Sequence, residues 1–397
     1  MIYYSKNIVT PRGVIEGFLK VSNGKIVGVS NECKEPFIDY TDEIILPGFI
    51  DVHVHGWGRG SYMFEKTPES IVLMAEDQAK EGVTGFLATT VTDSLEETYR
   101  YIEAANEIYG KPIHGSKFMG VHLEGPFMNK EHKGMQKEEY CINPDLSLMK
   151  SFVDLQVEPR MIKLMTIAPE LDGSKEVIKY CKENGIQLSI GHSGATFDVI
   201  SELKEYGLGG VTHMFSGMKG IHHRELGVVG TALYYDDLMC EFAKQTGMTV
   251  RHEAFDIVYR IKGADGIFMT TDCAGLANRR EPSYHYVRKI TFSREGNEFI
   301  MKHDSGEVER INIDDYSSLR TLEMGYIDSI KNMLRHTPMT YPELAKITSL
   351  NPARYIGMDD HKGKIQEGYD ADLTIVTPHM TLCETVVEGE RVVVVER

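Results

Sequence analysis

Six side chains that can bind a metal or transfer a proton each follow an apolar run in this sequence. They are His53, His55, Glu124, His192, His213 and Asp272. Imidazoles and carboxylates without a thiolate form a ligand set that suits zinc or a similar divalent cation. Because a bound divalent cation lowers the pKa of a water and polarises a carbonyl, this set indicates metal-assisted hydrolysis.

The pair His53-Val54-His55 has a spacing that favours metal binding. Alternate residues of a strand share one face, so both imidazoles would point to the same place. Alone, this pattern is as often two buried core histidines. Glu124, which stands between an apolar run and Gly125-Pro126, is poorly explained by packing. The other polar residues at strand ends make a chance pair improbable.

Eight strand-like runs alternate with helical patterns such as Ile71–Glu81 and Ser174–Asn184. This alternation is typical of βαβ units that close into a TIM barrel. The runs lie near Ile45–His55, Gly85–Val91, Phe118–Glu124, Ile162–Ala168, Gln187–His192, Gly210–Met214, Met239–Ala243 and Ile267–Asp272. Active sites of such barrels lie at the carboxyl ends of the strands, where all six residues would converge.

Both ends of the chain are rich in strand-like segments. Val14–Val21 precedes the hairpin signal Asn23-Gly24, and residues 371–376 and 391–395 also have strand patterns. We therefore expect a small β-sandwich domain from residues 1–47 and 350–397, with the barrel in residues 48–349. The fold class is α/β.

Composition restricts the class of protein. The 397 residues carry a formal net charge of -16, which disfavours broad binding to nucleic acid or to an anionic membrane. Six scattered cysteines form no CxxC pair, and no apolar stretch reaches the roughly 20 residues of a membrane helix. The start lacks a signal-peptide pattern, so the expected location is the cytoplasm.

Longer motifs resemble one known family. Leu46–Gly56 is similar to the opening segment of the amidohydrolases, and Gly363–Leu373 to a feature of that superfamily. Further matches make the chain resemble the N-acetylglucosamine-6-phosphate deacetylase family over nearly its whole length. They are His122–Phe127, Ile167–Glu170, Gly191–Thr196, Thr212–Phe215, Arg224–Gly227, Thr271-Asp272 and Asn351–Arg354.

The resemblance implies a role for each site residue. Glu124, His192 and His213 would hold the main metal, and His53 and His55 a second ion that some members lack. Asp272 would act as general base and then as general acid. Arg224 would meet the phosphate of an anionic amino sugar, and Ser216-Gly217 the sugar. One or two ions, zinc above all, and a homodimer are also implied.

The segments that read the substrate depart from the family. Ser216-Gly217 replaces Asn-Ala, and Gln136, which follows Met135, replaces a histidine. Thr246-Gly247-Met248-Thr249 replaces Asp-Gly-x-His, so His252 is the candidate substitute. Residues 275–318 match poorly.

Two other functions remain open. The chain could hydrolyse another N-acyl compound, such as N-acetylgalactosamine-6-phosphate, an N-acyl amino acid or a cyclic amide. Many such enzymes bridge two metals with a carboxylated lysine late in strand four, where this chain has Thr166-Ile167-Ala168. A non-catalytic scaffold is the distant alternative, and it would be expected to have lost metal ligands.

Overall fold

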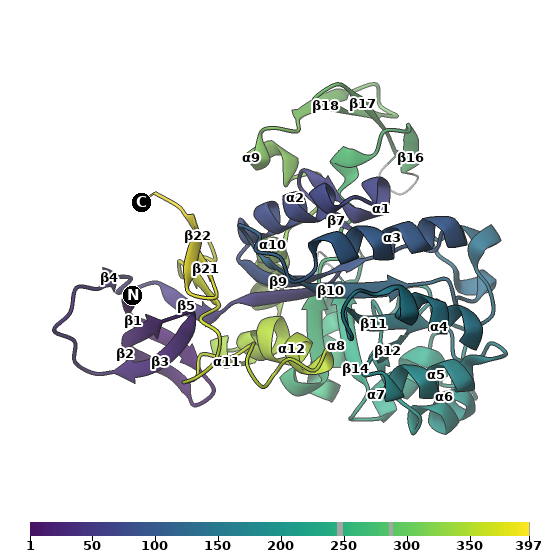
Figure 1. Ribbon diagram of the computed structural model, residues 1–397, viewed down its shortest axis with the longest axis horizontal. Coiled ribbons are helices and arrows are strands. Elements are labelled where there is room, and N and C mark those ends of the chain that lie inside the picture. Colours follow the sequence, from purple (N-terminus) through teal and green to yellow (C-terminus); the bar gives the residue numbers. More distant parts are fainter. Residues whose placement is uncertain (244–248, 286–288, 397) are drawn as a thin grey trace.

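The computed structural model describes residues 1–243, 249–285 and 289–396. Its centre is a barrel of parallel strands in which each strand pairs with the next along the chain (Figure 1). The barrel strands are β6 (Phe49–Val54), β9 (Val83–Thr89), β10 (Lys117–Glu124), β11 (Ile162–Ile167), β12 (Gln187–Ile190), β13 (Leu208–Val211), β14 (Met239–Ala243) and β15 (Ile267–Thr270). The amide of Asp272 donates to the carbonyl of His53 over 2.8 Å, which brings the two ends of the sheet together.

A helix follows each barrel strand and covers its outer face. These helices are α2 (Pro68–Ala79), α3 (Leu95–Ile108), α4 (Leu146–Leu155), α5 (Ser174–Glu183), α6 (Phe197–Lys204), α7 (Gly227–Tyr234), α8 (His252–Lys262) and α10 (Tyr326–His336). The predicted helices 71–81 and 174–184 are α2 and α5. The start of α2 is fixed by Thr67, whose side chain caps the Ser70 amide, and by Pro68 in the first turn.

The two ends of the chain build one sheet beside the barrel (Figure 1). Its strands are β1 (Ile2–Thr10), β2 (Gly13–Ser22), β3 (Lys25–Ser30), β4 (Ile38–Asp39), β5 (Ile44–Pro47), β20 (Leu373–Val376), β21 (Leu382–Val387) and β22 (Glu390–Val394). β5 pairs with β1 and β20, so the N-terminal and C-terminal segments share one hydrophobic core. The prediction of a TIM barrel with a small β domain from both termini is confirmed.

The predicted first barrel strand, 45–55, was wrong as a single element. It is two strands, β5 and β6, which belong to different sheets and meet at Gly48. The Gly48 amide donates to Asp372, and a Cβ at this position would lie 2.1 Å from Thr84. Glycine is therefore required where the chain passes from one sheet to the other.

Two short helices, α11 (Tyr341–Ala345) and α12 (Asn351–Tyr355), lie between the small sheet and the barrel (Figure 1). A π-helical turn at Lys346–Leu350 joins them. Ala353 and Tyr355 pack with Ile50, Leu164 and other inward side chains in a separate apolar cluster. This packing closes the barrel at the end opposite the strands' carboxyl termini.

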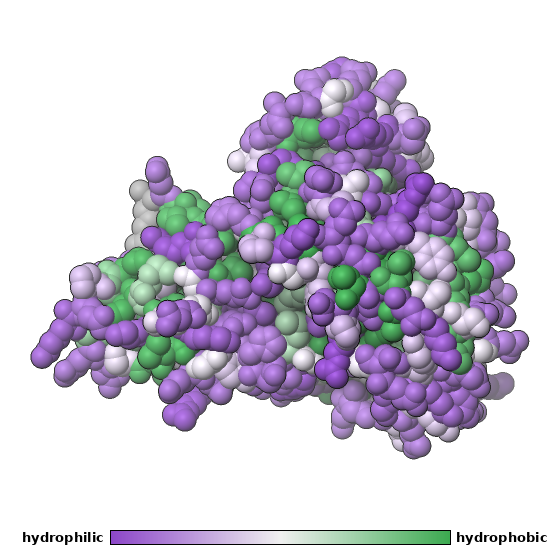
Figure 2. Space-filling view, viewed as in Figure 1, coloured by the Kyte–Doolittle hydropathy of each residue, from purple (hydrophilic) through white to green (hydrophobic). Residues whose placement is uncertain are grey.

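The described residues within 275–318 form a separate antiparallel sheet. Its strands are β16 (Ser283–His285), β17 (Ile290–Glu295), β18 (Glu298–His303) and β19 (Val308–Asn312), followed by α9 (Tyr316–Leu319). The sheet has a core of its own around Phe292 and Phe299, and its face in Figure 2 is largely hydrophilic. Among the described residues, none of the helices has the length and apolarity to span a membrane.

Candidate metal centre

Three of the predicted site residues lie just past the carboxyl ends of barrel strands. His192, His213 and Asp272 each stand two positions after the last residue of β12, β13 and β15. Their φ angles are 49°, 33° and 49°. Non-glycine residues seldom adopt such left-handed angles, and those that do cluster at functional sites. The local backbone turns these side chains from the strand direction into the barrel mouth.

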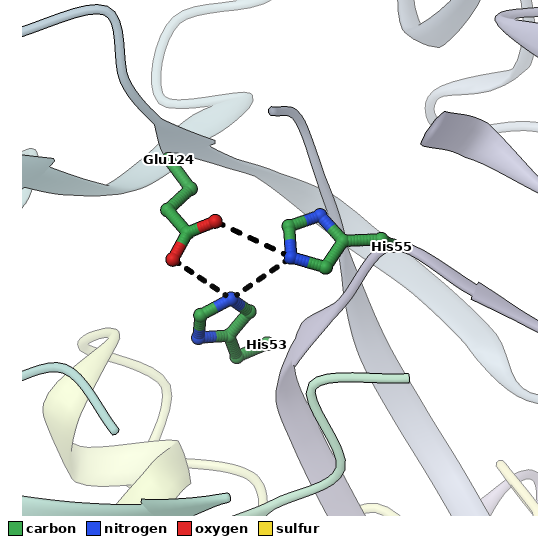
Figure 3. A group of neighbouring side chains, drawn as sticks. All are labelled: His53, His55 and Glu124. Atoms are coloured by element: carbon green, nitrogen blue, oxygen red, sulfur yellow. Dashed lines mark hydrogen bonds and ion pairs between the residues drawn. The ribbon is translucent and has the colours of Figure 1, made fainter. Parts of the chain in front are cut away.

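Glu124, the last residue of β10, is the centre of the cluster. Its Oε1 lies 3.2 Å from His192 Nε2 and 3.1 Å from His213 Nε2. The same oxygen lies 3.5 Å from His53 Nε2, and Oε2 lies 3.3 Å from His55 Nε2. Figure 3 shows the rings of His53, in β6, and His55, just after it, facing this carboxylate from one side. Two groups that could each hold a cation therefore share Glu124.

Asp272 completes the cluster from the last barrel strand. Its Oδ1 lies 3.4 Å from His53 Nε2 and 3.2 Å from His55 Nε2. The side chain is 30% exposed, whereas the side chain of Glu124 is 2% exposed. Asp272 is thus the acid of the cluster that a small molecule in the barrel mouth can reach.

The outer ring nitrogens of the four histidines orient them for metal binding. Each Nδ1 faces an oxygen that can only accept a hydrogen bond from it: Glu241 Oε1 for His53, the Thr89 carbonyl for His55, the His132 carbonyl for His192 and the Ser216 carbonyl for His213. In the neutral rings Nδ1 therefore carries the proton, and Nε2 presents its lone pair to the centre. This is the tautomer that a metal-binding histidine requires.

The charges of the cluster favour a cation. Burial opposes ionisation of Glu124, but His53, His192 and His213 hold the pKa of its carboxyl well below the usual range. Burial also disfavours the charged form of His55, yet hydrogen bonds to Asp272 and Glu124 raise its pKa to about 9. Without metal, the acids thus keep protons on the imidazoles, and a divalent cation would replace those protons. The residues fit such an ion.

The chain is similar to known amidohydrolases over nearly its whole length. Residues 44–393 match the model described as "Amidohydrolase family". A Lysinibacillus sphaericus protein named N-acetylglucosamine-6-phosphate deacetylase is 31% identical over 93% of this chain and 91% of its own length. A Bacillus subtilis protein of the same name is 30% identical over 96% of this chain and 94% of its own.

The chain belongs to the N-acetylglucosamine-6-phosphate deacetylase family of amidohydrolases. A solved structure supports the same placement. The N-acetylglucosamine-6-phosphate deacetylase of Thermotoga maritima superposes on this amidohydrolase with a TM-score of 0.79. The two are 30% identical, and the alignment covers 100% of each chain.

Three residues expected to read the substrate lie at the metal centre of this amidohydrolase. Gln136 is buried, and its Nε2 donates to Glu124 Oε2 over 2.7 Å. Ser216 supplies the carbonyl that holds His213. Gly217 has a φ of 57°, and a Cβ there would lie 3.0 Å from His192 Nδ1, so a larger residue would crowd that ring.

The other substrate candidates lie elsewhere in the described parts of the chain. Met135 is 86% exposed, although its neighbour Gln136 is buried. Arg224 is exposed on the loop before α7, where its amide bonds His222. His252 begins α8 and stacks on His336 of α10 at 3.7 Å. Of the substituted segment 246–249, residues 246–248 lie outside the described residues.

Sequence reasoning missed two buried residues that contact the cluster of the amidohydrolase, Glu241 and His122. Glu241 is fully buried in β14 and bonds both His53 and the backbone of His213. The available signal was an acid within the otherwise apolar run Met239–Ala243. His122, also buried, stacks edge-on against His53 at 4.6 Å, and burial lowers its pKa well below the usual value.

Proposed function

We propose that this chain is a metal-dependent deacetylase that hydrolyses N-acetylglucosamine-6-phosphate to the free amino sugar phosphate and acetate. The observation that carries the proposal is the convergence of four imidazole Nε2 atoms on Glu124, with Asp272 at the exposed edge. The full-length similarity to proteins named for this activity supports the substrate.

The metal ligands follow from the two groups that share Glu124. We assign Glu124, His192 and His213 to the main ion and His53 and His55 to a second one. Nitrogen and oxygen donors without sulfur suit zinc. When bound, such an ion polarises a carbonyl and lowers the pKa of a nearby water. The oriented Nδ1 donors and the shared carboxylate are what this chain contributes to holding it.

Asp272 is the proposed catalytic residue. Burial raises its pKa, but His53 and His55 outweigh that effect and hold the carboxyl ionised. An ionised Asp272 can take a proton from the attacking water while the water oxygen bonds to the acetyl carbon. It then gives that proton to the sugar nitrogen as the carbon–nitrogen bond breaks. The products are acetate and the free amine.

The substrate would be held around this centre by residues of the barrel mouth. Arg224 offers a planar guanidinium that can grip a phosphate with two hydrogen bonds. Ser216, Gly217 and Gln136 line the metal cluster and would face the sugar and its acetyl group. Met135 and His252 remain proposed contacts of the sugar.

The experiment measures acetate release by the metal-loaded protein from N-acetylglucosamine-6-phosphate. N-acetylgalactosamine-6-phosphate, the unphosphorylated sugars and an N-acetyl amino acid serve as comparison substrates. We expect the first substrate to give the highest kcat/KM. If the protein binds metal but prefers another N-acyl compound, the proposed substrate is wrong, and the changes at Gln136, Ser216 and Thr249 mark a different specificity.

We also propose a cytoplasmic homodimer. Tyr234 of α7 is 65% exposed, and Ile257 and Ile261 of the neighbouring α8 are 54% and 52% exposed. Such apolar exposure on adjacent helices is typical of protein contacts. A charged sugar phosphate crosses membranes poorly, which favours action inside the cell. Sedimentation equilibrium of the parent and of Ile257→Lys tests the dimer, and a monomeric parent refutes it.

A further inference from the structure

Glu241 is a buried acid without an assigned role in the proposed reaction. It stands in β14 between Cys240 and Phe242, and its side chain is fully buried. In the described residues its ion-pair partner is His53 rather than a lysine or arginine. Burying a carboxylate without a full cationic partner costs free energy, so packing alone gives no reason to keep this acid.

One oxygen of Glu241 contacts both halves of the metal centre. Oε1 accepts a hydrogen bond from His53 Nδ1 over 2.8 Å and another from the His213 amide over 3.1 Å. His53 belongs to the group with His55, and His213 to the group with His192. The same atom thus orients one histidine from each group.

The contact to His53 fixes the tautomer and the orientation of its imidazole ring. A carboxylate can only accept, so Nδ1 carries the proton and Nε2 is left for a cation. That Nε2 lies 3.5 Å from Glu124 Oε1 and 3.4 Å from Asp272 Oδ1. Without Glu241 the ring could rotate or change tautomer, and its lone pair would leave the centre.

The contact to His213 fixes its backbone. His213 has a φ of 33°, an unfavourable angle for a residue with a side chain. The Glu241 carboxylate accepts its amide hydrogen, and the Glu241 carbonyl accepts the next amide, of Met214, over 2.8 Å. These two bonds hold the turn that aims His213 into the barrel mouth.

The charge of Glu241 is only partly compensated by the groups that contact it. Within the described parts of the chain, Oε2 has no hydrogen-bond partner. A carboxylate left half-satisfied in an apolar strand is stabilised if positive charge lies just beyond the ring that it holds. The imidazole of His53 is the bridge between that charge and Glu241.

We propose that Glu241 is a positioning residue that couples the two cation subsites by setting the His53 tautomer and the His213 turn. This inference rests on the proposed metal-dependent function, but it concerns the binding of the ion rather than the identity of the substrate. Loss of a carboxylate that orients a metal-binding histidine typically costs about 10–100-fold in metal affinity or activity.

The test is a calorimetric titration of the metal-free protein with Zn²⁺, followed by the absorption spectrum with Co²⁺. The variants are Glu241→Gln, which keeps the shape and one acceptor, and Glu241→Leu, which keeps neither acceptor nor charge. Glu384→Gln is the matched control, because Glu384 is equally buried but bonds Tyr3, Tyr40 and Arg391 in the small β domain.

We expect Glu241→Leu to weaken binding of at least one ion by about 10–100-fold and to alter the Co²⁺ spectrum. Glu241→Gln should fall between it and the parent, and Glu384→Gln should bind as the parent does. Unchanged affinity, stoichiometry and spectrum in Glu241→Gln and Glu241→Leu overturn the inference, as does a parent that binds no ion. A parent that binds metal but releases no acetate refutes the proposed substrate and leaves this inference standing.

Discussion

The carboxamide of Gln136 is hydrogen-bonded to Glu124, the acid that all four histidines of the centre face. Gln136 Nε2 donates to Glu124 Oε2 over 2.7 Å, and its Oε1 accepts from the Thr92 amide over 2.8 Å. The sequence comparison predicted that Gln136 takes the place of a family histidine, and the structure bonds its amide to the shared carboxylate of the candidate metal centre. Gln136 therefore positions Glu124 through this hydrogen bond, apart from any contact that it makes with the substrate.

Replacing Gln136 with leucine leaves both the Glu124 oxygen and the Thr92 amide without this partner. We expect Gln136→Leu to lower kcat/KM by about 10–100-fold, because an unanchored ligand holds its ion less well. Steady-state acetate release at saturating and at limiting zinc measures the loss. Val157→Ala, at an exposed position in the loop between α4 and β11, is the control and should change little. Equal activity in parent and Gln136→Leu would show that the hydrogen bond has no role.

Asp272→Asn removes the proposed proton carrier and keeps the side chain's shape. We expect kcat to fall by about 10²–10⁴-fold, the usual contribution of general acid–base catalysis. Zinc content should stay within error of the parent, because Glu124 and the four histidines remain. The measurement pairs acetate release with metal analysis of the same sample. A variant that turns over normally, or one that has simply lost its metal, contradicts the assignment.

Removal of the metal should abolish activity and lower thermal stability together. A ligand at 100 times its Kd stabilises the folded protein by about 2.7 kcal/mol. We therefore expect dialysis against a chelator to reduce Tm by several degrees and added Zn²⁺ to restore both Tm and acetate release. Scanning calorimetry with and without zinc makes the measurement. Full activity after verified metal removal would exclude a metal-dependent reaction.

The convergence of the candidate ligands was predictable because a barrel brings the carboxyl ends of its strands to one mouth. An apolar run followed by His192, His213 or Asp272 was enough to place each residue there, and the two-residue spacing of His53 and His55 placed their rings on one side. The left-handed backbone at three of these positions was not predictable. It depends on partners such as Glu241, which become neighbours only when the barrel closes.

Glu241 and Gln136 show where sequence reasoning stopped. Glu241 and His53 are 188 positions apart, and no local pattern links an acid in one strand to a ring in another. Gln136 was expected to face the substrate by analogy with the family, and its bond to Glu124 emerged only from the fold. The sequence did not predict the structure of residues 275–318, whose described part forms a sheet with a core of its own.

Arg224→Met tests the proposed phosphate contact. The guanidinium would bind phosphate in the ground state and transition state alike, so its loss should raise KM more than it lowers kcat. We expect KM for N-acetylglucosamine-6-phosphate to rise at least 10-fold, with little change for N-acetylglucosamine. Arg224→Lys should recover part of the affinity, since lysine keeps the charge without the planar fork. Equal losses on both sugars would assign Arg224 a structural role.

A short hairpin of β7 (Gly56–Trp57) and β8 (Gly60–Ser61) follows His55. It is anchored by an ion pair whose strength depends on pH. Arg59 contacts Asp77 at 2.8 Å, and the Asp77 side chain is fully buried. Burial raises the pKa of Asp77, but hydrogen bonds from Arg59 and Lys80 outweigh it, so the net pKa is lowered. The pair therefore stabilises the fold above the unfolded pKa of about 3.9, and this contribution is lost as pH falls through the lower folded value.

Arg59→Met should thus destabilise the protein at pH 7 by about 2 kcal/mol, less than a fully buried pair would lose because Lys80 remains beside Asp77. The difference from the parent should shrink as pH falls below about 3.9, where Asp77 of the unfolded chain takes up a proton. Urea unfolding can be followed by Trp57, the single tryptophan, whose ring nitrogen bonds the Asp77 carbonyl. Arg100→Met removes an exposed ion pair of α3 and should change the urea midpoint little at either pH. A difference between Arg59→Met and the parent that stays constant from pH 7 to pH 3.5 would mean that the Asp77 charge does not anchor this hairpin.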